Sequence, residues 1–276
     1  MDGVRIDYFR RQFLQQRPAR HFDFAGSRDE EWQDAVAAVC VHGPKAYTTR
    51  VIKALMASLG PEEAVSVDLL TLYTDLMAQA VVDDESSVVV YTASDFSVRI
   101  LESKYLTAGG STGLRTWNAA MCLAEHLIAN PHLLHGKRVV ELGSGTGLVA
   151  IVCARLGGNI LATDKDARAI DGILHNAKQN SVHVSTEWFA WGESIQADLL
   201  VAADVIYDPV AIPLLLQTIA LANCDAIIAA ETRSESTFLT FQEELLHQHL
   251  SLETLPPEPK LFFYDAPVKK FHIHRI

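Results

Sequence analysis

Three acidic residues each follow an apolar, strand-like run in the second half of the chain: Glu141, Asp164 and Asp204. The first of them lies in VVELGSGTGL (residues 139–148), where glycine recurs at every second position from Gly143. Glycine lets the backbone approach a ligand closely and adopt positive φ angles. Carboxylates and a bare backbone at the ends of neighbouring strands therefore predict a site for a small, positively charged ligand.

Two ligands suit such a loop: the phosphates of a dinucleotide, and the ribose and aminoacyl parts of S-adenosylmethionine. The dinucleotide fingerprint requires glycine at its first, third and sixth positions. Here Gly143 and Gly145 fit, but the sixth position is Leu148. Clustered carboxylates would also repel a pyrophosphate, whereas they attract a sulfonium and an ammonium. We therefore predict S-adenosylmethionine as the cofactor and expect nicotinamide dinucleotides to be excluded.

Asp164 ends the strand-like run NILATD, which follows the glycine loop in the chain. A carboxylate at that strand end can accept hydrogen bonds from both ribose hydroxyls. Taken alone, Asp164 could instead cap the helix that follows it, which is a common role for aspartate. The glycine loop before it favours the ribose.

The segment 86–276 predicts the elements that must position these acids. From KRVVEL to DAIIAAE, strand-like runs alternate with helical runs, which predicts a mainly parallel sheet covered by helices. The last predicted helix spans 235–250. After it, KLFFYDAPVKKFHIHRI contains two strand-like runs around Pro267, which predicts an antiparallel hairpin at one sheet edge.

Residues 1–85 read instead as helices separated by Gly43 and by Gly60. We find no catalytic constellation in this region and predict a helical cap or a module for partner recognition. In its last helix, four apolar residues at helical spacing are expected to pack inward: Leu69, Leu70, Tyr73 and Leu76.

Composition narrows the class of protein. Thirty-four acidic residues against twenty-three lysines and arginines give a net charge of −11 over 276 residues, which argues against direct binding of nucleic acid. The four cysteines form no C-x-x-C pair, so a metal or disulfide role is not expected. Histidines two positions apart near the C-terminus are interpreted as solvated. Since neither a signal peptide nor a membrane span is apparent, we expect a cytoplasmic protein.

Three segments resemble the seven-strand class of S-adenosylmethionine-dependent protein-lysine methyltransferases over residues 88–276: GGSTGLRTWNAA, VVELGSGTGL and AADVIYDP. The third contains Asp204-x-x-Tyr207, which matches the D-x-x-Y signature of that family. The helical N-terminal region, the connector ending in Trp117 and the segment KLFFY resemble the branch that methylates a lysine of translation elongation factor 2. One departure is Asn118, where relatives usually have aspartate.

The resemblance implies a Rossmann-like sheet of seven strands and a set of cofactor-binding residues. Besides the strand-end acids Glu141 and Asp164, this set contains Trp117, Gly143, Ser144, Gly145, Trp191 and Ala203. The last two are expected to flank the adenine. Trp188 is the alternative in WFAWG, but Trp191 directly precedes a glycine where a loop over the adenine should begin. Trp117 could instead be a core residue.

Asp204 and Tyr207 are expected to orient the acceptor amine rather than to act as a dedicated general base. The resemblance implies a protein partner, elongation factor 2, together with a monomer that binds neither membrane nor nucleic acid and needs no metal. Three alternatives stay open: core packing of Tyr207, methylation of another protein or a small molecule by the same core, and a catalytically silent binding module.

Overall fold

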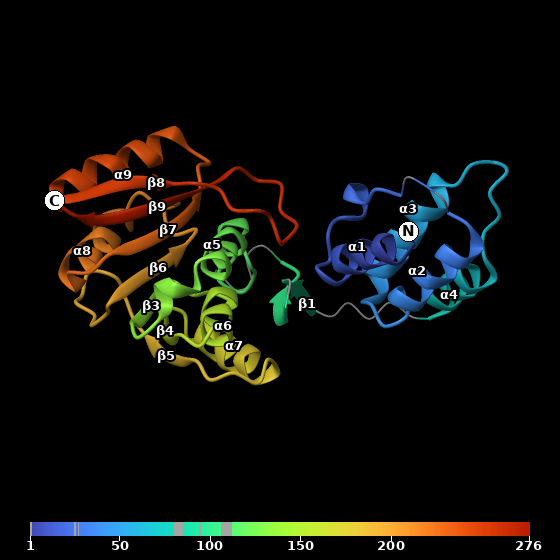
Figure 1. Cartoon of the computed structure of the whole chain (residues 1–276), viewed down its shortest axis with the longest axis horizontal. Coiled ribbons are helices and arrows are strands. Elements are labelled where there is room, and N and C mark those ends of the chain that lie inside the picture. The colour runs from blue at the N-terminus through green and yellow to red at the C-terminus, as the bar shows by residue number, and fades with distance from the viewer. Residues whose placement is uncertain (1, 25, 27, 80–84, 94, 106–111) are drawn as a thin grey trace. The chain divides into compact units, whose positions relative to one another are not determined.

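The computed structural model describes residues 2–24, 26, 28–79, 85–93, 95–105 and 112–276 (Figure 1). The chain divides into two compact units, Met1–Thr92 and Ala93–Ile276. Residues 107–111, which belong to the connector that ends in Trp117, lie outside the described residues, as do residues 80–84 of the predicted helical region 1–85. Among the described residues, no helix has both the length and the apolar character needed to cross a bilayer.

The first unit is a small helical body with an aromatic core. Its elements are α1 (Asp2–Leu14), a 3-10 turn (Ala19–His21), α2 (Glu30–Cys40), α3 (Lys45–Ser58), α4 (Val67–Ala78) and the strand β1 (Ser86–Thr92). Phe9 packs against Phe13, Phe22 and Trp32, with ring centroids 5.4–6.2 Å apart. Large aromatic side chains bury much area per residue, so this unit has a hydrophobic core of its own.

The inward face of α4 differs by one position from the prediction. Leu69 and Leu76 are buried as expected, and Tyr73 is half-buried against the same core. The prediction that Leu70 packs inward is wrong, because its side chain is 46% exposed. Leu72 packs on the core in its place, since the stripe of a helix that faces its neighbours continues at i+3 and i+4 rather than at i+1.

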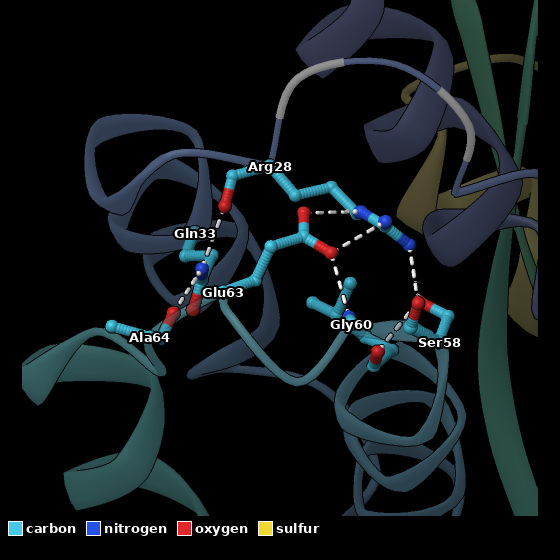
Figure 2. Close-up of polar contacts among 7 residues, drawn as sticks. Arg28, Gln33, Ser58, Gly60, Glu63 and Ala64 are labelled. Carbon is cyan, nitrogen blue, oxygen red and sulfur yellow. Dashed lines mark hydrogen bonds and ion pairs between the residues drawn. The ribbon is translucent and has the colours of Figure 1, made fainter.

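A polar network ties the segment before α2 to the end of α3 (Figure 2). The guanidinium of Arg28 donates to both carboxylate oxygens of Glu63, at 3.0 and 2.7 Å, and to the carbonyl of Ser58. Glu63 also accepts the N–H of Gly60, and Gln33 donates to the carbonyl of Arg28. A bidentate ion pair with this many backbone contacts neutralises both charges and also fixes the conformation of the two loops that it joins.

The second unit is built on a seven-stranded sheet with the order β5-β4-β3-β6-β7-β9-β8. The strands are β3 (Arg138–Leu142), β4 (Asn159–Asp164), β5 (Ser185–Trp188), β6 (Leu199–Ala203), β7 (Ala226–Glu231), β8 (Leu250–Leu255) and β9 (Val268–Arg275). Strands β3 to β7 pair in parallel, and β9 pairs antiparallel with both β7 and β8. The Rossmann-like, mainly parallel sheet with antiparallel edge strands is confirmed.

Helices cover both faces of this sheet (Figure 1). They are α5 (Asn118–Ala129), α6 (Leu148–Arg155), α7 (Ala167–Gln179), α8 (Ile212–Ala222) and α9 (Glu235–His247), with β2 (Ser97–Ser103) beside α6 and α7. On one face, Ile212, Leu215 and Phe241 of α8 and α9 share a buried cluster with strand residues. Because both faces are covered, the parallel strands are apolar along most of their length.

The edge hairpin forms from other residues than predicted. KLFFY is not a strand, because its backbone N–H groups are taken by a side chain of α5. Leu261 and Phe262 donate to Oε1 of Glu125 at 2.6 and 2.8 Å, and the hydroxyl of Tyr264 donates to Oε2 at 2.6 Å. The predicted helix over 235–250 ends early, and its last residue begins β8. The hairpin therefore consists of β8 and β9.

Candidate active site

One cavity of about 540 Å³ lies at the carboxyl ends of β3, β4 and β6. Its size is that of a typical small-molecule site, and its place is the one where open α/β sheets bind ligands. All of the residues predicted for the site line it: Trp117, Glu141, Gly143, Ser144, Gly145, Asp164, Trp191, Ala203, Asp204 and Tyr207. The fold thus gathers residues from five separate segments of the chain around a single space.

The glycine loop between β3 and α6 forms a close-fitting backbone wall of this cavity. Gly143 and Gly145 have φ angles of 72° and 52°, which residues other than glycine adopt rarely. A Cβ on Gly143 would lie 3.3 Å from Val205 and 3.4 Å from the Trp191 ring, and one on Gly145 would lie 3.0 Å from the Gly113 carbonyl. Only glycine therefore leaves this wall open to a ligand.

Asp164 connects the end of β4 to the glycine loop. One of its carboxylate oxygens accepts the N–H of Gly145 at 3.0 Å, and the other accepts the N–H of Asp166 at 2.9 Å. The cap of α7 is Asp166, which accepts the N–H of Arg168, so the alternative capping role does not belong to Asp164. Burial raises the pKa of the Asp164 carboxyl, although the backbone N–H groups oppose the rise.

Glu141 contributes a buried carboxylate to the site. It is 2% exposed, and its Oε2 has no hydrogen-bond partner among the described residues. Burial raises the pKa of this carboxyl to about 8. A buried polar atom without a hydrogen-bond partner destabilises the fold. The unpaired carboxylate oxygen of Glu141 therefore suits the ammonium group of S-adenosylmethionine, which could donate a hydrogen bond to it. The residues present therefore fit the predicted cofactor.

The two tryptophans of WFAWG have different environments. Trp188 is 62% exposed and is not among the residues that line the cavity, and its Nε1 donates to the carbonyl of Lys165. Trp191 lines the cavity and packs against the core beneath it. The position of Trp191 is the one that can cover a flat ligand ring.

Asp204 and Tyr207 lie on the loop that follows β6. Asp204 has a φ angle of 55°, and its side chain is 9% exposed. Burial raises the pKa of this carboxyl, and the guanidinium of Arg233 opposes the rise through a 2.7 Å contact. Tyr207 is 53% exposed on the cavity wall, so the alternative that it packs in the core is wrong.

Two further residues of the site escaped the sequence interpretation. Nη2 of Arg233 contacts Oδ2 of Asp204 at 2.7 Å and Oε2 of Glu231 at 3.3 Å. The guanidinium also lies 5.0 Å from the centre of the Trp117 ring. Glu231 ends β7 and could have been found as a fourth strand-end acid. Arg233 had no such signal, because Asp204 and Trp117 are distant from it in the sequence.

The departure at Asn118 has a direct counterpart in this group. Asn118 Nδ2 donates to Oε2 of Glu231 at 3.3 Å. An aspartate at that position would instead bring another carboxylate next to Glu231. The amide thus supports the negative charge of Glu231 rather than competing with it.

Replacing Asp164 by alanine is expected to weaken S-adenosylmethionine binding by roughly 1.5–3 kcal/mol, the range for hydrogen bonds to charged groups. The lost binding energy has two sources: the hydrogen bonds to the ribose, and the hydrogen bond from the Gly145 N–H that holds the glycine loop. Isothermal titration calorimetry on folded protein measures it. Asp166→Ala is the matched control: it should lower the melting temperature through loss of the α7 cap, with a smaller effect on affinity. Unchanged affinity in Asp164→Ala would contradict the ribose assignment.

Comparison with known proteins agrees with this geometry. A family model described as "Lysine methyltransferase" matches residues 97–246. A protein-lysine N-methyltransferase EFM3 of Chaetomium thermophilum is 30% identical over 240 aligned positions, covering 72% of this chain and 71% of that protein. The protein-lysine N-methyltransferase EEF2KMT of Homo sapiens is 28% identical and covers 94% and 93% respectively.

The solved structures confirm the fold class. A 16S rRNA methyltransferase of T. thermophilus (RsmC), in complex with AdoMet and guanosine, matches with a TM-score of 0.51 at 11% identity, covering 86% of this chain and 71% of that one. The expected enzyme class, a protein-lysine N-methyltransferase, and the expected cofactor, S-adenosylmethionine, are confirmed through the family. This chain belongs to the lysine methyltransferase family.

Proposed function

We propose that this protein methylates a lysine of translation elongation factor 2. What carries the proposal is the convergence, in one cavity, of the glycine loop, the strand-end acids and Tyr207. The choice of substrate rests on relatives named EEF2KMT, of which the Mus musculus protein is 30% identical over 82% of this chain. The lysine is the acceptor, and the cytoplasm, where translation takes place, is the proposed compartment.

The cofactor site would be formed by residues from β3, β4, β6 and the connector. S-adenosylmethionine, when bound, supplies a methyl group on a positively charged sulfur. In the proposal, Glu141 pairs with its ammonium, Asp164 accepts from its ribose hydroxyls, and Trp191 with Ala203 flanks its adenine. Gly143, Ser144, Gly145 and Trp117 complete the lining. This arrangement fixes the methyl donor and excludes water from it.

The acceptor site would be formed by Asp204 and Tyr207 at the cavity mouth. Free lysine has a pKa near 10.4, so about one part in a thousand is neutral at pH 7.4. The protein must therefore hold a neutral amine in line with the bond that breaks. A carboxylate oxygen of Asp204 and the phenol of Tyr207 can accept the two N–H bonds of that amine and so aim its lone pair.

The direct test is methyl transfer from labelled S-adenosylmethionine to purified elongation factor 2, with the modified lysine located by mass spectrometry. We expect a single labelled lysine in that factor. Labelling of another protein in a lysate, with none in elongation factor 2, would keep the enzyme class and overturn the substrate.

We further propose that residues 1–85 recognise the protein substrate. This region has an aromatic core of its own and forms a compact unit separate from the one that carries the cavity-lining residues. Deleting it is expected to impair methylation of intact elongation factor 2 far more than S-adenosylmethionine binding. Calorimetry and a transfer assay on the same truncated protein compare the two. An equal loss of both would mean that the region stabilises the catalytic unit instead.

A further inference from the structure

A positively charged side chain already occupies the mouth of the cavity. The guanidinium of Arg233 is held by Asp204 at 2.7 Å and Glu231 at 3.3 Å, and it lies over the Trp117 ring. Two carboxylates and an aromatic face are the groups that bind organic cations in proteins. A cation of the chain itself thus sits where the acceptor ammonium would otherwise be attracted.

Charge balance explains why this site needs a resident cation. The side chains of Asp204 and Glu231 are 9% and 22% exposed, and a single nitrogen of Arg233 contacts an oxygen of each. Without the guanidinium, two poorly solvated carboxylates would face each other, and their repulsion would favour protonation of one of them. Arg233 therefore keeps both carboxylates ionised.

The same balance decides the form in which a lysine binds. Two uncompensated carboxylates would stabilise the ammonium, and an ammonium has no lone pair with which to attack a methyl group. A fixed guanidinium beside the same site repels the ammonium and favours the neutral amine. The residue that neutralises the acids therefore also lowers the pKa of the acceptor.

We propose that Arg233 is a positioning residue that stays between Asp204 and Glu231 during methyl transfer and keeps the acceptor lysine neutral. The proton of the lysine passes to solvent water as the amine binds. This inference rests on the proposed function, because it takes Asp204 as the group that orients the acceptor. It assigns to Arg233 and Glu231 a role that the D-x-x-Y signature does not contain.

Other ionisable groups near the site act less directly. Tyr207 and Asp208 lie on the same loop as Asp204, and Glu141 and Asp164 line the cavity from the ends of β3 and β4. Arg115 also lines the cavity, but its guanidinium donates to the carbonyl of Lys104. The charges that act on Asp204 in this structure are those of Arg233 and Glu231.

The test is the pH dependence of single-turnover methyl transfer at saturating S-adenosylmethionine, which reports the ionisation of the bound acceptor. Arg233→Gln is expected to raise the apparent pKa of the rate by about one unit or more. The rate should then be about tenfold lower near pH 7.5 and recover at high pH. Arg233→Lys should restore most of the wild-type profile. Arg138→Gln removes an exposed ion pair with Asp198 at the other end of the sheet and should leave the profile unchanged.

Two outcomes would overturn the inference. A faster Arg233→Gln enzyme at neutral pH would mean that Arg233 blocks the site and must leave it. A rate reduced equally at every pH would mean that Arg233 has only a structural role.

A second measurement does not depend on the substrate. Carbon-13 NMR of the aspartate carboxyls, with Asp204 assigned through Asp204→Asn, should show a higher pKa for Asp204 in Arg233→Gln than in wild type. An unchanged pKa would refute the role of Arg233 in any case. If this pKa rises while the wild-type enzyme does not methylate elongation factor 2, the substrate proposal alone fails.

Discussion

Replacing Asp204 by alanine is expected to slow methyl transfer by about a hundredfold or more, the scale of a lost transition-state contact. Affinity for S-adenosylmethionine should change only a few-fold. The side chain is 9% exposed at the cavity mouth and holds Arg233, so its removal leaves the acceptor amine unoriented and the guanidinium without its closest partner. Loss of an interaction made mainly in the transition state lowers kcat and kcat/KM together.

Single-turnover transfer to elongation factor 2 with saturating cofactor measures this effect. Tyr207→Phe removes only a hydroxyl and should cost less than Asp204→Ala. Asp198→Ala is the matched control, because it removes an exposed carboxylate at the opposite ends of the strands, where Asp198 pairs with Arg138. A folded Asp204→Ala protein with the wild-type rate would end the acceptor-site assignment.

The unliganded protein is expected to lose stability as pH rises from about 4.5 to 8. Burial raises the pKa of Glu141 from 4.5 to about 8, so within this window the folded protein binds more protons than the unfolded chain. The free energy of unfolding then falls with pH, by up to roughly 5 kcal/mol at about 1.36 kcal/mol per pKa unit. Burial also raises the pKa values of Asp164 and Asp204, which act in the same direction.

Urea unfolding without cofactor, repeated across this pH range, measures the effect. Glu141→Gln should resemble wild type near pH 4.5 and be several kcal/mol more stable at about pH 8, because an amide has no buried charge to form. Glu243→Gln changes an exposed helical carboxylate and should leave the pH dependence unaltered. Saturating S-adenosylmethionine should flatten the wild-type curve. A wild-type curve without a slope would show that Glu141 is ionised without cost.

The sequence predicted the cavity because its determinants are local. Glu141, Asp164 and Asp204 each end an apolar strand, and parallel strands bring their carboxyl ends to one edge. The glycine pattern separated two cofactors without knowledge of any contact. The side chains around Arg233 could not be predicted in this way, since that group joins residues from the loop after β6, the end of β7 and the start of α5.

The errors in the fold have the same origin. KLFFY has the composition of a strand, but a buried carboxylate of α5 binds its N–H groups. Likewise, the helical pattern over 235–250 continues past the point where His249 adopts a φ angle of 56° and β8 begins. Tertiary contacts at these places override the local preference. Leu70 shows the same limit within a helix, where apolar character alone does not decide which face is covered.

The sheet order also has a consequence for biosynthesis. Strand β9 lies between β7 and β8, although β8 is made first. Strand β8 therefore cannot join the sheet until β9 has been inserted, and until then β7 presents an open edge. Open edges of this kind invite pairing with other chains. The nascent protein should thus be most prone to aggregation, and most dependent on chaperones, in the interval between synthesis of β8 and insertion of β9.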